Sequence, residues 1–276
     1  MKEIILTVKK TLSIPVECSE ISPNSFAGKT LDQIRAIEAW EGNRRNRLED
    51  IFHVKEEGNT AAEGLTVRIV GDASRIRKIG HRMTEGSIAV EGNAGMYLGE
   101  EASGGSIKVS GNAGAWLGSR MKGGTIEVKG NAGDFVGSSY RGSTKGMKGG
   151  TIIVHGDAGT EIGCWMRNGT IRIKGSTGMF PSMHMSNGTV HIEKDCLGRA
   201  GAQMTGGKVI IGGYLPAILP SFNIEEVREK VKVGEEKITG PFYVFTGDLN
   251  EDGNGKLFVN VGKNPHLKRC EEYLES

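Results

Sequence analysis

Apolar and polar residues alternate over short segments that recur through the middle of the chain. Each segment has a glycine, then two Ile or Val residues separated by one variable residue. Seven copies begin at Gly86, Gly105, Gly124, Gly150, Gly169, Gly188 and Gly207. Within a copy the two apolar residues are two positions apart, so they face the same side of a strand. The residue between them is Lys108 in one copy, Glu127 in another and Ile153 in a third. The pattern predicts short strands with one buried face.

The copies recur every 19 residues, except that seven residues are inserted between Gly124 and Gly150. A strand this short is not stable alone, and the fixed period predicts that it pairs with the next copy, ~4.8 Å away. An imperfect eighth copy, Val67–Ile69, precedes the others. The period predicts an all-β fold, a right-handed parallel β-helix of about seven to eight coils, with small α/β caps at both ends.

The turns after the strands repeat as well. Polar residues occupy one register, at Asp72, Asn93, Asn112, Asn131, Asp157, Ser176 and Asp195. Such side chains bond their own turn backbone, so we interpret this row as structural. A calcium-binding roll fits less well, because its nine-residue period is missing.

The two ends do not repeat, and we divide the chain into an N-terminal cap (1–63), a repeat domain (64–214) and a C-terminal helix and hairpin cap (215–276). In the first cap the pattern predicts a strand at Ile4–Val8, a helix opening at Thr30, and a strand over Arg47–Val54. In the last it predicts a helix from Asn223 to Lys232, then a hairpin of Phe242–Phe245 and Leu257–Val261.

The composition limits the classes of function that the chain can have. The 43 glycines suit tight corners, and the net charge of +2 gives no sign of nucleic-acid binding. No apolar run approaches the ~20 residues of a membrane helix, and the first residues are too short and too acidic for a signal peptide, so we expect a cytoplasmic protein. The four cysteines form no C-x-x-C pair, which argues against an Fe–S site or a disulfide framework within this chain.

No catalytic, cofactor-binding or metal-binding residues are predicted. The histidines lack metal-site spacing, and His155 and His191 occupy outward positions where we expect solvated or partner-facing side chains. The loop opening at Asp248 resembles the start of an EF-hand, but its twelfth position is Val259 rather than Glu, so an ordinary hairpin loop is preferred.

Two features predict a partner interface. Ile153 and Ile210 are apolar at the outward strand position, where most copies are polar, so we expect them under a cap or another chain. The insertion, which contains Tyr140 and Arg141, departs from an even repeat, and such loops are frequent contact sites.

The repeated unit G-x-x-M-x-x-G-x-[IV]-x-[IV]-x-G stands at Gly80–Gly92, Gly118–Gly130, Gly163–Gly175 and Gly201–Gly213. It resembles the repeat of the C subunit of formylmethanofuran dehydrogenase from methanogenic and related archaea. Outside the repeat, Phe26–Thr30, Trp40–Asn43 and Phe245–Leu249 also resemble that protein. The repeat alone is similar to the C-terminal domain of the glutamate synthase large subunit, and to the C subunit of a bacterial formyltransferase/hydrolase complex.

The resemblance implies a noncatalytic scaffold subunit of an oxidoreductase complex that reduces CO2 and forms N-formylmethanofuran in the first step of methanogenesis. It implies one partner subunit with molybdopterin (Mo or W) and Fe–S clusters, an amidohydrolase-like partner with a two-metal site, and possible ferredoxin-like subunits. The alternatives are a binding module of a glutamate-synthase-like or formyltransferase/hydrolase complex, and, less well supported, a carbohydrate-active enzyme.

Overall fold

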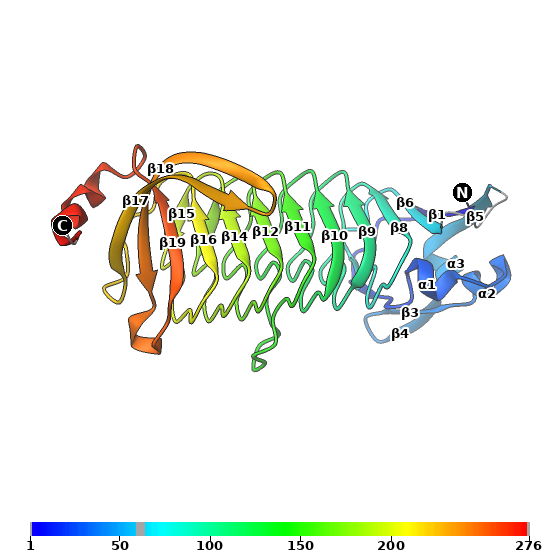
Figure 1. The fold of residues 1–276 in the computed structure, drawn as a ribbon. Helices are drawn as coiled ribbons and strands as arrows, with labels where there is room; N and C mark the ends of the chain where they lie inside the picture. Colours follow the sequence, from blue (N-terminus) through cyan, green and yellow to red (C-terminus); the bar gives the residue numbers. More distant parts are fainter. Residues whose placement is uncertain (1, 59–63, 275–276) are drawn as a thin grey trace.

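The computed structural model describes residues 2–58 and 64–274. Within them a mixed sheet of 13 strands runs the length of the molecule, in the order β17-β18-β19-β16-β14-β12-β11-β10-β9-β8-β6-β1-β5 (Figure 1). The parallel strands of its middle are β6 (Leu65–Val70), β8 (Ser87–Glu91), β9 (Ser103–Val109), β10 (Gly123–Val128), β11 (Thr151–Val154), β12 (Thr170–Ile173), β14 (Thr189–Ile192) and β16 (Lys208–Ile211). We call residues 65–211 the central stack.

Strands of the central stack pair in register with the copy one period away. Ile107 lies beside Ile88 on one side and beside Ile126 on the other. The seven inserted residues do not disturb this register, because Ile126 lies beside Ile152. The expected pairing of each strand with the next copy is confirmed, and the inward Ile and Val residues are buried.

The polar turn residues stabilise the central stack between copies. The backbone N–H of Asn112 donates to Asn93 Oδ1 (2.9 Å), and that of Asn131 donates to Asn112 Oδ1 (2.8 Å). The same bond continues from Asp157 to Asn131 (2.9 Å). We expected these side chains to bond their own turns, and most of them instead satisfy the backbone of the neighbouring copy.

The predicted fold class, a right-handed parallel β-helix with small α/β caps, has to be corrected. The described residues are organised around one large mixed sheet with few helices, and strands from both ends extend this sheet with antiparallel pairs. Away from it, most turns meet only at single bridges such as Ala94 to Ala113, and a short second parallel sheet joins β13 (Thr177–Met179) to β15 (Cys196–Gly198). Glycines and other residues with positive φ interrupt longer strands there.

The N-terminal region covers one end of the central stack. Strand β1 (Lys2–Val8) pairs with β6 and with β5 (Phe52–Glu57), which confirms the expected first strand. A small sheet contains β4 (Arg44–Arg47), β3 (Glu38–Glu41), β2 (Val16–Glu17) and β7 (Ile76–Arg77), and the helices are α1 (Pro23–Phe26), α2 (Leu31–Arg35) and α3 (Leu48–Ile51). Thr30 caps α2 through the expected capping box, whereas the strand expected over Arg47–Val54 is interrupted by α3.

At the other end the chain returns to the sheet. The expected helix after Asn223 is wrong, because this segment is strand β17 (Asn223–Val233), which pairs antiparallel with β18 (Glu236–Gly247). The expected hairpin of β18 with β19 (Gly255–Asn260) is confirmed. Two short 3-10 helices follow β18 and β19, η1 (Leu249–Glu251) and η2 (Pro265–Tyr273). The predicted division after residue 63 falls beside residues outside the described ranges, and the three-part division stays a prediction.

Replacing Gly124 by Ala will test how tightly successive copies pack. Gly124 has φ +84°, and a Cβ there would lie 2.7 Å from the carbonyl oxygen of Gly105. We expect a loss of roughly 2.5 kcal/mol in the free energy of unfolding, measured by denaturant titration. Gly142, with φ +79° and no atom within 4 Å of such a Cβ, is the matched control. Gly142→Ala should cost about 1 kcal/mol from backbone strain alone, and equal losses would contradict the close approach at Gly124.

Candidate protein-interaction surface

Three aromatic residues one period apart form a ladder along one corner of the central stack. Tyr97, Trp116 and Phe135 all have positive φ, at 63°, 58° and 65°. Their rings are stacked, with centroids 5.2 Å apart for Tyr97 and Trp116 and 4.5 Å apart for Trp116 and Phe135. A left-handed backbone costs roughly 1–2 kcal/mol at a residue with a Cβ. Ring stacking and the bonds between copies offset this strain.

The insertion lies on this ladder. The Tyr140 ring stacks on Tyr97 (5.8 Å) and on Trp116 (6.2 Å), and its hydroxyl donates to the Tyr97 hydroxyl (3.2 Å). The Arg141 guanidinium lies 5.7 Å from the centre of the Phe135 ring. The Trp116 Nε1 donor is buried and has no hydrogen-bond partner among the described residues. Tyr140 itself remains 42% exposed, so an aromatic and a cationic side chain are held together at the surface.

Hydrogen bonds at both ends of the insertion hold it in place. The backbone N–H of Cys164 donates to Ser138 Oγ (3.2 Å), and the Ser138 hydroxyl donates to the carbonyl of Glu161. Further along, the Arg167 guanidinium donates to the carbonyl of Thr144 (3.0 Å). The protrusion seen below the strands in Figure 1 is therefore fixed to the body of the protein at its base.

A buried ion cluster lies close to the ladder. Glu101 is 7% exposed, and its carboxylate meets Arg120 (2.7 Å), Arg82 (3.1 Å) and Lys122 (3.7 Å). Burial alone would raise the pKa of Glu101, but these cations, Arg120 above all, hold the pKa below its ordinary value. Burial raises the pKa of the Tyr97 phenol. Near neutral pH Glu101 is therefore ionised and Tyr97 is neutral, and neither changes its charge.

The structure places the other two predicted interface residues on the outer face of the sheet. Ile153 lies beside Glu127 and Arg172 and is half-buried. Ile210 is fully buried, because the β17–β18 hairpin lies over it. The residues packed with Ile210 are Val231, Val233, Phe242, Val244 and Phe258. We expected either a cap or another chain to cover Ile210. The hairpin of this chain covers it, so Ile210 is not available to a partner subunit.

The histidines at outward positions have different surroundings. His155 is half-buried, with Nε2 2.8 Å from Glu127. His191 was expected to be solvated or partner-facing, and this is wrong, since it is 3% exposed beneath the hairpin. Its Nδ1 is buried and has no hydrogen-bond partner in the described part of the chain. In the hairpin loop the Asp248 carboxylate accepts N–H bonds from Gln203 (2.9 Å) and Asn250 (3.1 Å). Within residues 2–58 and 64–274, no three His, Cys, Asp or Glu side chains are grouped as a metal site would require.

Comparisons with known proteins identify the family. No family model matches the sequence. The C subunit of the tungsten-containing formylmethanofuran dehydrogenase 2 of Methanococcus maripaludis is 47% identical over 274 residues, which cover 97% of this chain and all of that one. The chain belongs to the family of formylmethanofuran dehydrogenase C subunits. The C subunit of the molybdenum-containing formylmethanofuran dehydrogenase 1 of Methanosarcina barkeri is 41% identical over 98 residues, 36% of this chain and 33% of that one.

A solved structure resembles this member of the formylmethanofuran dehydrogenase family over most of its length. It is a chain in the crystal structure of the formyltransferase/hydrolase complex of Methylorubrum extorquens with methylofuran. The TM-score is 0.81 at 26% identity, covering 93% of this chain and 99% of that one. The sequence pattern pointed to the family, to Tyr140 and to Arg141. It did not point to the ladder beneath them, although Tyr97, Trp116 and Phe135 recur at the 19-residue period.

Proposed function

We propose that this chain is a noncatalytic subunit of a formylmethanofuran dehydrogenase complex and that it braces the subunits that carry out the chemistry. The observation that carries the proposal is the end-to-end likeness to a C subunit of this enzyme at 47% identity. The complex would reduce CO2 and form N-formylmethanofuran, as the resemblance of the repeat implies. The relatives are named as parts of tungsten- or molybdenum-containing enzymes, so Mo or W would reside in a partner subunit.

A formyltransferase/hydrolase complex is the second candidate, because a chain of such a complex shares the fold. Its identity is 26%, against 47% for the dehydrogenase subunit, and we therefore prefer the dehydrogenase. No helix in the described part of the chain is long and apolar enough to cross a membrane.

Purification of the native protein will test this assignment. We expect the chain to elute with a molybdopterin and Fe–S subunit and with an amidohydrolase-like subunit, identified by mass spectrometry. Elution with the second subunit but without the first would favour the formyltransferase/hydrolase complex. Elution of a lone monomer would contradict both.

Within this proposal, Tyr140 and Arg141 contact a partner subunit. A rigid, half-exposed aromatic ring beside an arginine is typical of residues that dominate interface energy. Tyr140→Ala should weaken assembly by about tenfold, measured by titration of labelled chain into the remaining subunits. Trp40→Ala is the matched control, since Trp40 is an aromatic residue of similar exposure (47%) in the N-terminal sheet. Equal affinities of the two variants would exclude the insertion from the interface.

A further inference from the structure

The central stack has an opening at each end. At the N-terminal end, Phe26, Ile34 and Phe52 are at most 2% exposed, and an opening of about 620 Å³ lies beside Phe26 and Leu65. At the C-terminal end an opening of about 700 Å³ remains. Its apolar lining comes from Ile218, Leu219, Phe222, Phe245, Leu267 and Tyr273. At this C-terminal end, apolar side chains of the core are therefore accessible from the surface.

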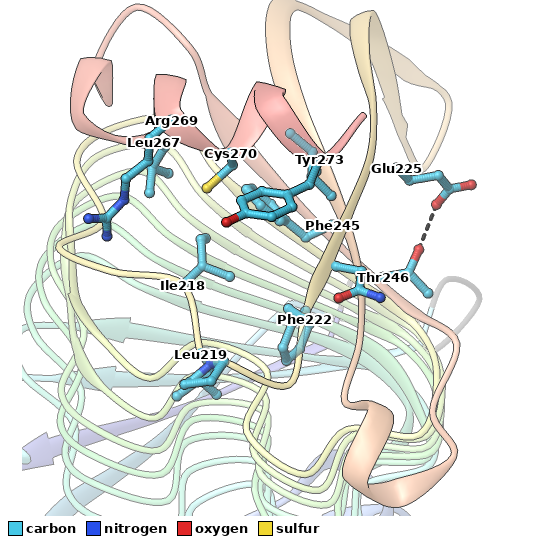
Figure 2. A pocket seen from close by; sticks show the side chains of 13 residues that line it. Ile218, Leu219, Phe222, Glu225, Phe245, Thr246, Leu267, Arg269, Cys270 and Tyr273 are labelled. Carbon is cyan, nitrogen blue, oxygen red and sulfur yellow. Dashed lines mark hydrogen bonds between the residues drawn. The ribbon is translucent and has the colours of Figure 1, made fainter. Parts of the chain in front are cut away.

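Helix η2 lies over this opening but does not fill it. Figure 2 shows Cys270 and Tyr273 hanging from η2 above Ile218, with Phe222 and Leu219 on the opposite side. Leu267 is buried and anchors the helix, whereas Tyr273 is 77% exposed. Terminal units of stacked repeats normally present a polar outer face. An end that leaves apolar side chains accessible is typical of a surface that another chain covers.

Two charged residues line the opening, Glu225 and Arg269, and only one of them is paired within the described part of the chain. Glu225 is already paired, since its carboxylate accepts from the Thr246 hydroxyl (2.6 Å) and forms an ion pair with Lys256. Arg269, on η2, makes no ion pair or hydrogen bond through its side chain to any described residue. Among the described residues that line the opening, Arg269 is therefore the cation without an ion-pair partner, and it lies beside an apolar surface. An apolar segment that carries a carboxylate is its chemical complement.

The adjacent backbone favours a polypeptide as the occupant. Strand β17 stands last in the order of the 13-stranded sheet, and its residues Asn223, Ile224 and Glu225 line the opening. An extended segment placed there gains main-chain hydrogen bonds from the edge strand while its side chains enter the apolar pocket.

We propose that this opening receives an apolar segment of a partner subunit and that a carboxylate of this segment pairs with Arg269. The inference rests on the proposed function, because it requires that the chain assembles with other subunits. It adds a second contact, at the C-terminal end of the central stack, to the one at Tyr140.

Site-specific cross-linking in the assembled complex tests the occupant. A photoreactive phenylalanine analogue at position 273 should cross-link to a partner peptide that contains Asp, Glu or a C-terminal carboxylate. The same analogue at position 140 reports on the insertion. A cross-link at 140 without one at 273, a cross-link from 273 only to a second copy of this chain, or one to a peptide without a carboxylate would overturn the inference and leave the proposed function intact. Failure of the wild-type chain to assemble would reject the proposed function itself.

Charge reversal tests the role of Arg269. We expect Arg269→Glu to weaken assembly about tenfold or more, and Arg269→Lys to stay within about threefold of wild type. Lys268→Glu is the matched control, because Lys268 is the exposed neighbour on η2 and does not line the opening. It should change affinity less than about twofold. Equal effects of Arg269→Glu and Lys268→Glu would overturn the pairing of Arg269 with a carboxylate.

Discussion

Replacing Ile210 by Asp will destabilise the fold by about 4 kcal/mol or more, measured as the free energy of unfolding in denaturant. Ile210 is fully buried between the sheet and the β17–β18 hairpin, where Phe242 and Phe258 surround it. A carboxylate at this position would lack a partner and would detach the hairpin.

Ile153→Asp is the matched control for this experiment. Ile153 occupies the same outward row of the sheet, but it lies beyond the hairpin and between the charged residues Glu127 and Arg172. We expect a cost of about 1 kcal/mol. Similar losses at Ile153 and Ile210 would show that the hairpin does not cover Ile210 in solution.

Lowering the pH from 6.5 to 4 will remove about 3 kcal/mol of stability through His191 alone. The pKa of His191 is lowered from 6.5 to about 4, chiefly by burial beneath the hairpin; Arg172 acts in the same direction, and Glu193 and Glu236 oppose the shift. The unfolded chain binds a proton near pH 6.5, whereas the folded chain binds it only near pH 4. The free energy of unfolding therefore loses nothing through His191 above pH 6.5. It falls as the pH decreases toward 4, and well below pH 4 His191 causes no further loss.

His191→Gln isolates this effect, because glutamine does not titrate. Denaturant titrations of both proteins between pH 7 and pH 4 should give a steeper loss for the wild type, and the difference between the two curves is the contribution of His191. Carboxylates with lowered pKa values, such as Glu127 and Glu225, act equally in both proteins. Parallel curves would contradict the burial of His191.

The sequence predicted those features that depend on neighbouring residues or on the repeat. The alternation at Ile88 and Val90 and its 19-residue period specified which strands pair, because each strand finds its partner one period away. The capping box at Thr30 also formed, since its two hydrogen bonds lie within four residues.

Features that depend on distant segments were missed. Asn223–Glu226 also matches a capping box, but the segment pairs with β18, and those contacts outweigh the local preference for a helix. His191 looks like a surface residue in the repeat, yet it is buried, because a hairpin from a later part of the chain lies over it. The same hairpin covers Ile210, for which a cover was expected. The mixed sheet has the same cause, since nothing in the repeat predicts that both ends add strands to it.

The candidate interface was predicted only in part. Tyr140 and Arg141 were identified because they interrupt the repeat. The opening at η2 was not, because its lining comes from three separate segments, represented by Phe222, Phe245 and Leu267, that meet only in the folded chain.

Because the strands of the central stack pair in register, the number of copies sets the distance between the insertion and the opening. The insertion precedes β11, and the opening follows β19, with β12, β14 and β16 between them, so about four strand spacings, or ~19 Å, separate the two strands. This separation changes in whole steps, because each copy adds one strand and one strand spacing to the sheet. A lineage that gained or lost one 19-residue copy between them would move the insertion and the opening apart or together by ~5 Å.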